Sequence, residues 1–358
     1  MLRQVVSEAV IQVLTPGARL GNRLVEKFCD PYPRVLHNGA QGGLGGPTVK
    51  LNRMQRYFPN DPFDYNIIYS VSARIPAHVC RQAQARGCKV VCHVNSVFHP
   101  AYRADYAERN APIAEVYAMA DYVVYGSRYA QAGVERYLGQ VPVPHSIVYN
   151  AVDTSYFRPP EARAQDRFNV LAVGIHYIRH RLEPLIRAMP YVQNVYPQAR
   201  LIIAGPLQKG EGIFDCGLGS MQAVADEVGL GNVDWLGSYT QKEAPLIYAR
   251  GDVLVHLKHM DWTPNTVIEA MACGLPIVHT GNGGMDELVG SAGVSLNVPF
   301  DWDQIHTPDP SYVAECIIEA YKRRLDLGTM ARQIAVERYE MQAWVEAHRQ
   351  IFASLLRP

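Results

Sequence analysis

The sequence predicts an α/β protein made of two doubly wound parallel-sheet domains. Its 358 residues fit two domains at about 150 residues each. Short β-branched runs alternate with amphipathic stretches, and the runs are apolar almost throughout, which is typical of parallel strands covered on both faces. The segment 153–167 lacks periodicity and contains Pro159-Pro160. It is therefore predicted to be a linker between the two domains.

The first domain is predicted over residues 30–155, after a helical extension over residues 1–29 that is broken at Pro16-Gly17. The apolar face of this extension favours packing on the domain surface; docking on a membrane surface is the open alternative. Ser127 is the predicted N-cap of a helix over 128–138. Strands are predicted in this domain at 34–37, 65–69, 89–93, 122–125 and 146–149.

The second domain is predicted over residues 156–335, followed by a C-terminal helix over 336–358 that crosses back to the first domain. Because ligands bind at the carboxyl edges of parallel strands, two such domains predict a binding cleft where these edges face each other. Strands are predicted in this domain at 168–174, 201–205, 233–237, 252–255 and 275–278.

Composition narrows the possible functions. The 34 Lys+Arg balance the 34 Asp+Glu, which argues against a protein that binds nucleic-acid phosphates. No apolar run approaches the ~18 residues of a transmembrane helix, and the first residues lack the pattern of a secretory signal. The seven scattered cysteines are typical of reduced thiols. We therefore expect a cytoplasmic protein, with peripheral contact at a membrane as an open alternative.

The segment 261–276 carries the strongest chemical signal. Thr263 is a predicted N-cap, Pro264 suits the first helical position, and Gly274 ends the helix. Free backbone N–H groups and the positive end of the helix dipole then predict a phosphate site at Thr263, Pro264, Asn265 and Thr266. Glu269 lies about 7.5 Å from the start of the predicted helix, at ~1.5 Å per residue. There it could accept hydrogen bonds from a ribose.

These residues resemble the retaining GT-B glycosyltransferases of the GT4 family, also called glycosyl transferases group 1. The resemblance rests on several motifs in order: Asp261-x7-Glu269, Ala270-Met271-Ala272-Cys273-Gly274-Leu275-Pro276, Gly283-Gly284-Met285-Asp286-Glu287-Leu288-Val289, Asn150-Ala151-Val152-Asp153 and Phe157-Arg158-Pro159. It implies two Rossmann-like domains, with the ribose on Glu269 and the donor sugar by Asp261. Asp261 is one methylene shorter than the family's usual Glu.

Two cations of the family pattern are missing. Members usually follow the first strand of this domain with Gly-Arg and place Lys-Gly shortly after, and these cations hold the diphosphate. Here Gly174 is followed by Ile175. The candidate replacements are His176, Arg179, His180 and Arg181, since arginine can grip phosphate with two hydrogen bonds. Gly237, Ser238 and Tyr239, at a predicted strand end, could hold the base through backbone groups.

The first domain adds two further candidates. The glycine-rich run 39–48 has neither dinucleotide-binding nor P-loop spacing, and it resembles the family's glycine loop, which places Gly45 and Gly46 by the donor. His93 matches the family's histidine beside the donor sugar; a buried structural histidine is the alternative. Asp301-Trp302-Asp303 offers too few oxygens for a hard cation, so metal-free catalysis is expected.

The function predicted is transfer of a sugar from a UDP- or GDP-sugar to an acceptor hydroxyl, with retention at the anomeric carbon and without a cofactor. The acceptor is a glycan, a lipid-linked molecule or a small molecule. A sugar-nucleotide epimerase of similar architecture and a non-catalytic nucleotide-binding subunit remain alternatives.

Overall fold

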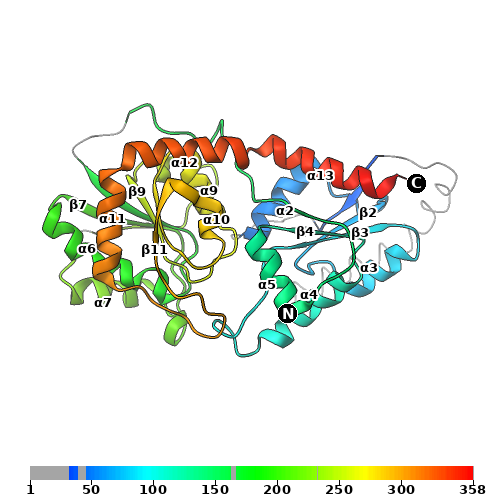
Figure 1. Ribbon diagram of the computed structural model, residues 1–358, viewed down its shortest axis with the longest axis horizontal. Coiled ribbons are helices and arrows are strands. Elements are labelled where there is room, and N and C mark those ends of the chain that lie inside the picture. The colour runs from blue at the N-terminus through cyan, green and yellow to red at the C-terminus, as the bar shows by residue number, and fades with distance from the viewer. Residues whose placement is uncertain (1–31, 39–45, 163–166, 232, 358) are drawn as a thin grey trace. The chain divides into compact units, whose positions relative to one another are not determined.

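The computed structural model describes residues 32–38, 46–162, 167–231 and 233–357. The predicted extension over 1–29 and the glycine Gly45 lie outside these residues. The chain divides into two units (Figure 1). Described residues up to His99, Arg103–Val148 and those from Trp344 onward form the first unit, and Pro100–Tyr102 with Tyr149–Ala343 form the second.

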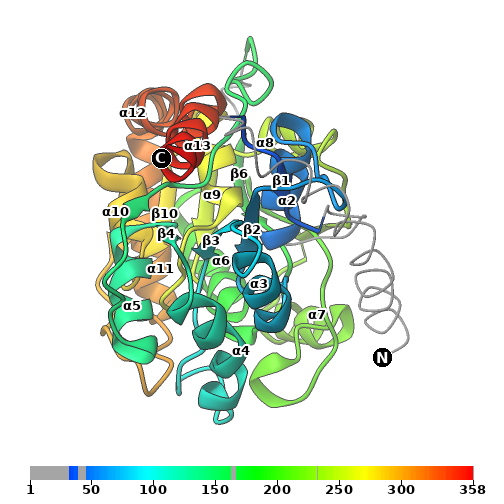
Figure 2. The same cartoon turned by 90° about the vertical axis from the view of Figure 1, so that its right-hand side faces the viewer.

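The first unit contains a parallel sheet whose described strands follow chain order, β1-β2-β3-β4-β5 (Figure 2). Strands β2 and β4 are buried almost throughout, and α3 and α4 pack on β3. The predicted N-cap is confirmed: Ser127 Oγ accepts from Ala130 N at 2.9 Å. The elements are β1 (Val35–Leu36), α2 (Gly46–Tyr57), β2 (Ile67–Val71), α3 (Ala77–Gln84), β3 (Lys89–Val94), α4 (Tyr106–Ala118), β4 (Tyr122–Tyr125), α5 (Arg128–Leu138) and β5 (His145–Ile147).

The last helix, α13 (Met341–Leu356), completes the first unit from Trp344 onward. Its Phe352 ring packs edge-on against Phe58 and Tyr69. The preceding helix, α12 (Arg324–Arg338), is separate, so the continuous helix predicted from residue 336 begins instead at Met341.

The described residues of the second unit form a parallel sheet of six strands in the order β11-β10-β9-β6-β7-β8. The order reverses between β6 and β9, and such a reversal opens a crevice at the carboxyl edge of a doubly wound sheet. The strands are β6 (Phe168–Val173), β7 (Ala199–Ala204), β8 (Val233–Gly237), β9 (Val253–His256), β10 (Ile277–Thr280) and β11 (Gly293–Leu296).

Alternate strand residues face two separate cores in this unit, as the two-residue period of a strand requires. Val170, Leu201 and Val253 face one core, while their neighbours Leu171 and Ile202 face the other. The first core lies under α6 (Glu183–Val195), α7 (Leu218–Glu227) and α11 (Pro310–Lys322). The second lies under α8 (Ala244–Tyr248), α9 (Asn265–Ala272), α10 (Met285–Val289) and α12. Short 3₁₀ turns occur at η1 (Arg179–Arg181), η2 (Gly212–Phe214) and η3 (Gly290–Ala292).

The prediction of two parallel-sheet α/β domains is confirmed. The near-continuous apolar character of the strands follows from burial on both faces. The six cysteines among the described residues, including Cys88 and Cys92, are buried thiols.

Candidate active site

Three glycines form a side-chain-free shelf where β6, β7 and β8 end. Gly174, Gly205 and Gly237 have φ of +132°, +114° and +66°, values that L side chains rarely adopt. Gly205 N donates to Gly237 O at 2.7 Å, and a Cβ on Gly205 would lie 1.9 Å from Gly174 O. The backbones of neighbouring strands can approach this closely only because no side chain intervenes. The shelf leaves the carboxyl edge of the sheet open to a ligand.

Replacing Gly205 with alanine is expected to lower the free energy of unfolding by roughly 3 kcal/mol or more, because the methyl group would overlap the Gly174 carbonyl. Gly229→Ala is the matched control, since Gly229 also has a positive φ, +68°, but has open space around it. Its expected cost is about 1 kcal/mol, from backbone strain alone. Thermal unfolding of the two variants measures the difference. Equal shifts would show that the close contact carries no cost.

Helix α9 points its first turn at this edge, but it begins one residue later than predicted. Pro264 is the N-cap, with extended backbone at φ −69° and ψ 124°, and its own side chain makes no capping hydrogen bond. The prediction of Thr263 as N-cap is therefore wrong; its carbonyl instead accepts from Asn150 Nδ2 at 2.6 Å. The first turn, which begins with Asn265 and Thr266, is the positive end of the helix dipole, and this end favours an anion.

Glu269 lies within α9 and is buried, with 3% of its surface exposed. Its Oε1 accepts from Gln241 Nε2 and its Oε2 from Tyr248 OH, both at 2.9 Å. Burial, together with the charge on Glu269, raises the pKa of Tyr248 well above its usual value, so this phenol stays protonated and donates. Tyr248 is buried, whereas Gln241 is exposed. One carboxylate oxygen therefore has a fixed donor and the other a donor that can move away.

Arg181 is the predicted cation that lies at this edge. Its guanidinium donates to Ile175 O at 2.6 Å. The position that a Cβ of Gly174 would take is 3.2 Å from Arg181 Nη2 and 3.7 Å from Thr266 Cγ2. The guanidinium therefore borders both the glycine shelf and the first turn of α9. Arg179, two residues earlier, instead contacts Glu183 at 2.9 Å and Ser220 at 2.6 Å, on α6 and α7.

The two predicted histidines carry no charge near neutral pH. Burial, and then the charge of Arg181, lower the pKa of His176 to about 3, and its Nε2 lies 3.1 Å from Ala204 O. Burial, and then His259, lower the pKa of His180 to about 3. Its Nε2 accepts from His259 N at 3.2 Å. A permanent positive charge at this edge therefore comes from Arg181 rather than from either histidine.

Asp261 is held by two residues that sequence reasoning missed. Its Oδ2 lies 2.8 Å from His256 Nε2, and its Oδ1 accepts from Lys258 Nζ at 2.7 Å. Burial opposes ionisation, but Lys258 and His256 outweigh it and hold the pKa of Asp261 well below its usual range. Burial also acts against the charge of Lys258, yet Asp261 raises the lysine pKa. His256 and Lys258 lie at the end of β9, where polar residues directly after an apolar strand are a readable signal.

Gly283 and Gly284 support the loop that carries Asp261. Gly284 N donates to Asp261 O at 2.8 Å, and a Cβ on Gly284 would lie 2.1 Å from Trp262 O. Met260 has a positive φ of +50°, and its N–H donates to Asn282 Oδ1 at 3.1 Å. The glycine pair therefore lets the loop pack backbone to backbone, which fixes the position of Asp261.

In the first unit, the structure places His93 in a fully buried cluster with Lys50 and Tyr69. Gly46, the described member of the predicted glycine pair, begins α2 and is exposed. Gly237, Ser238 and Tyr239 lie at the end of β8, with Ser238 exposed and Tyr239 half-buried.

Asp301 forms a local turn: its Oδ1 accepts from Asp303 N at 2.8 Å and its Oδ2 lies 2.8 Å from His306 Nε2. Within the described ranges, no group of three or more His, Cys, Asp or Glu residues is arranged to hold a metal ion.

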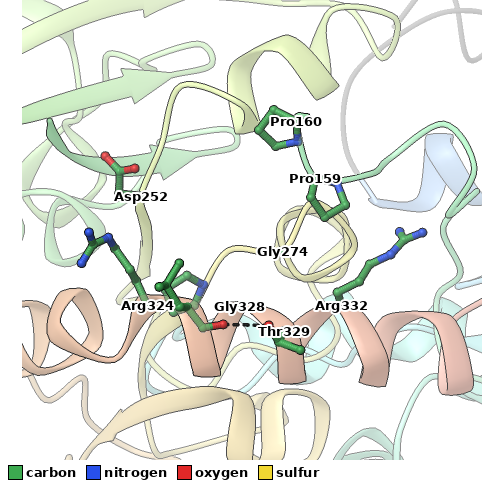
Figure 3. A pocket seen from close by; sticks show the side chains of 10 residues that line it. Pro159, Pro160, Asp252, Gly274, Arg324, Gly328, Thr329 and Arg332 are labelled. Atoms are coloured by element: carbon green, nitrogen blue, oxygen red, sulfur yellow. Dashed lines mark hydrogen bonds between the residues drawn. The ribbon is translucent and has the colours of Figure 1, made fainter. Parts of the chain in front are cut away.

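A cavity of about 570 Å³ lies at the opposite end of α9 (Figure 3). Its lining includes Gly274, Asp252 and two arginines of α12, Arg324 and Arg332. Arg332 donates to the carbonyls of Ala272, Phe157 and Thr154 at 2.8–3.0 Å. This guanidinium therefore caps the C-terminal end of the helix, where the dipole disfavours an anion. The cavity is not a second candidate for the phosphate site.

Residues 167–322 match a family model described as glycosyl transferases group 1. This part of the chain is therefore similar to members of that glycosyltransferase family. The match covers the sheet of the second unit with its glycine shelf, Arg181, Asp261 and Glu269.

Curated relatives match this chain only in part. The chain is 21% identical over 203 residues to the phosphatidylinositol N-acetylglucosaminyltransferase gpi3 subunit of Schizosaccharomyces pombe, covering 56% of this chain and 41% of that one. It is 23% identical over 183 residues to a phosphatidylinositol N-acetylglucosaminyltransferase subunit of Arabidopsis thaliana, covering 51% and 37%. The matched segments thus span less than half of either relative.

Solved glycosyltransferase structures match over most of the chain. HepE of Anabaena in complex with UDP-glucose has a TM-score of 0.66 at 19% identity, covering 86% of this chain and 82% of that one. Sucrose-phosphate synthase of Thermosynechococcus elongatus has a TM-score of 0.66 at 18% identity, covering 86% and 79%. The predicted GT-B fold, with two Rossmann-like units, is confirmed by these likenesses.

Proposed function

We propose that this protein is a retaining, metal-independent glycosyltransferase that moves a sugar from a nucleotide-sugar to an acceptor hydroxyl. The observation that carries the proposal is the convergence, at one sheet edge, of the N-terminal end of α9, the Arg181 guanidinium and the buried Glu269 carboxylate. A helix start and a guanidinium suit a diphosphate, and a buried carboxylate suits the two hydroxyls of a ribose.

The nucleoside is assigned to Glu269 and β8. When the ribose binds, its hydroxyls would take the place of Gln241 at Oε1, while Tyr248 keeps Oε2 in position. Backbone groups of Gly237, Ser238 and Tyr239 are the proposed contacts for the base.

The leaving diphosphate is assigned to Arg181 and the first turn of α9. Charge develops on this group as the bond to the sugar breaks, and fixed positive groups in a buried site stabilise it strongly. Arg181 takes the place of the family-pattern cations that this chain lacks, since Arg179 already contacts Glu183 and Ser220. Attack on the same face, with the donor phosphate helping to deprotonate the acceptor, follows from the family resemblance and needs no covalent intermediate.

The donor sugar is assigned to Asp261 in the second unit. The Asp261 carboxylate is ionised, fixed in place and able to accept a sugar hydroxyl. His93 has both ring nitrogens engaged by protein groups, so its proposed part is to position a neighbour rather than to touch the sugar.

UDP-N-acetylglucosamine and UDP-glucose are the donors to test first. Two relatives are named for transfer of N-acetylglucosamine to phosphatidylinositol, and HepE is described in complex with UDP-glucose. The relatives are also named as subunits, which supports assembly with partner chains. None of the described helices is long and apolar enough to cross a bilayer. Because both relatives are named for a phosphatidylinositol acceptor, the proposal includes peripheral contact with a membrane.

Release of nucleoside diphosphate tests the function directly. Each nucleotide-sugar is incubated with the protein, with and without phosphatidylinositol vesicles, and products are separated by mass. A glycosylated acceptor supports transfer, and a new sugar nucleotide formed without acceptor would point to an epimerase. Thermal stabilisation by UDP without any turnover would support a non-catalytic subunit, because a ligand stabilises whatever folded state it binds.

We expect turnover in excess EDTA to stay within about twofold of its value without chelator, because Arg181, Lys258 and the helix start supply the positive charge. The measurement is the initial rate with EDTA and then with added magnesium or manganese. Loss of activity in EDTA that magnesium restores would overturn metal independence without affecting the nucleotide site.

A further inference from the structure

A continuous chain of hydrogen bonds runs through the first unit. It starts at the Trp344 carbonyl, which lies 2.8 Å from His348 Nδ1 within α13. His348 Nε2 lies 2.9 Å from Tyr69 OH on β2, and the same hydroxyl contacts His93 Nδ1 on β3. His93 Nε2 contacts Lys50 Nζ on α2, and Lys50 Nζ also contacts Asn95 Oδ1 just after β3. We call these groups, from Trp344 to Asn95, the buried relay.

Solvent hardly reaches the relay. Tyr69, His93 and His348 are 0% exposed, and Lys50 is 1% exposed. Burial lowers the pKa of His348 to about 3, and burial, then Lys50, lower that of His93. Burial, then Arg53, lower the pKa of Lys50, while burial raises that of Tyr69. Both histidines are therefore neutral, and the phenol keeps its proton.

The donor and acceptor of every hydrogen bond in the relay follow from the bond between His348 Nδ1 and the Trp344 carbonyl. A carbonyl only accepts, so His348 Nδ1 carries the proton and its bare Nε2 accepts from Tyr69. The single phenol proton is then used, so Tyr69 accepts from His93 Nδ1–H. His93 Nε2 is in turn bare and accepts from Lys50, which also donates to Asn95 Oδ1.

We propose that α13 sets the tautomer of His93 through His348 and Tyr69. In the same proposal, Lys50 donates to both His93 Nε2 and Asn95 Oδ1 and so fixes the orientation of the Asn95 side-chain amide. The side chains before Asn95 are positioning residues in this proposal, and Asn95 ends the relay. Asn95 Nδ2 is buried and has no hydrogen-bond partner among the described residues. Asn95 follows the carboxyl end of a parallel strand, where ligands bind. The Asn95 Nδ2 group can therefore donate a hydrogen bond to an oxygen of a ligand.

Nitrogen NMR on ¹⁵N-histidine-labelled protein tests the tautomers directly, because protonated and bare ring nitrogens have well-separated shifts. Signals are assigned by their loss in His93→Gln and His348→Gln variants. We expect both residues to be neutral with the proton on Nδ1, the minor tautomer of free histidine. A proton on Nε2 of either residue, or a protonated ring, would overturn the proposal.

Tyr69→Phe breaks the relay at its centre. We expect His348 Nε2 to lose its donor and a population of His93 with the proton on Nε2 to appear. Tyr117→Phe is the matched control, since this buried tyrosine of the same unit pairs with Tyr125 and the Gly139 carbonyl and stands outside the relay. An unchanged His93 tautomer in folded Tyr69→Phe would refute the coupling. Should Tyr69→Phe fail to fold, His348→Phe tests the same step. Without the His348 acceptor, the Tyr69 hydroxyl can donate its proton to His93 Nδ1 instead of accepting from it.

The link to catalysis rests on the proposed function and is measured separately. Tyr69→Phe should lower kcat about tenfold, as loss of a group that orients a histidine typically does, with UDP affinity unchanged. Tyr117→Phe should change neither. If the tautomers are as expected but kcat stays at the wild-type value, the relay does not position the reaction. If the wild-type protein shows no turnover at all, the proposed function fails while the tautomer result stands.

Discussion

Replacing Arg181 with glutamine should weaken UDP binding about a hundredfold while affinity for uridine stays the same. The guanidinium borders Gly174 and Thr266, where the diphosphate is assigned. Loss of charge-assisted hydrogen bonds worth roughly 1.5–3 kcal/mol each accounts for the size of the effect. Uridine carries no phosphate and so reports only the ribose and base contacts. Calorimetric titration with both ligands separates the two contributions.

Arg179→Gln is the matched control for this experiment. Arg179 lies in the same 3₁₀ turn and carries the same charge, but it contacts Glu183 and Ser220. Its replacement should leave UDP affinity within about twofold, as expected for a largely structural surface contact. Arg181→Lys should recover only part of the loss, because lysine cannot form two parallel hydrogen bonds. Equal losses in the two glutamine variants would mean that net charge, not the position of Arg181, determines binding.

Glu269→Gln should lower UDP affinity about tenfold to a hundredfold, because a neutral amide replaces a charged acceptor of the ribose hydroxyls. The sharper measurement compares UDP with 2′-deoxy-UDP. The wild-type protein should prefer UDP, and the preference should shrink in the variant if Glu269 holds the ribose.

Glu287→Gln is the control, since that carboxylate also accepts from a tyrosine, Tyr149 OH at 2.6 Å, but belongs to α10. It should leave both UDP affinity and the preference for UDP unchanged. A full preference for UDP in folded Glu269→Gln would remove Glu269 from the ribose site.

Sequence patterns predicted the parts of this site that depend on local order. Glu269 could be placed because it shares one helix with the residues proposed to bind the phosphates, and helical rise fixes its depth. The glycines after β6 and β8 were identifiable as strand ends. Their close approach through Gly205 was not, because it depends on how neighbouring strands pair.

Other parts depend on contacts that no local pattern contains. Arg179 and Arg181 are equivalent in the sequence, and only the orientation of the 3₁₀ turn sends one toward α6 and the other toward Gly174. Lys258 and His256 are recognisable as polar residues at a strand end, but their contacts with Asp261 come from the fold of the loop and were missed. His93 could be read as a strand-end residue, but Tyr69, on the neighbouring strand, joins it to His348, which is 279 positions away from Tyr69.

The return of α13 to the first unit also bears on the order in which the protein matures on the ribosome. The buried neighbours of Tyr69 include His348 and Phe352, which are translated only after the whole of the second unit. Domains generally fold as units during synthesis, the N-terminal one first. Here the core of the N-terminal unit would lack His348 and Phe352 until the second unit has been translated. A nascent chain stalled before residue 344 should therefore expose Tyr69 and Phe58 to chaperones, although all strands of the first sheet have already been made.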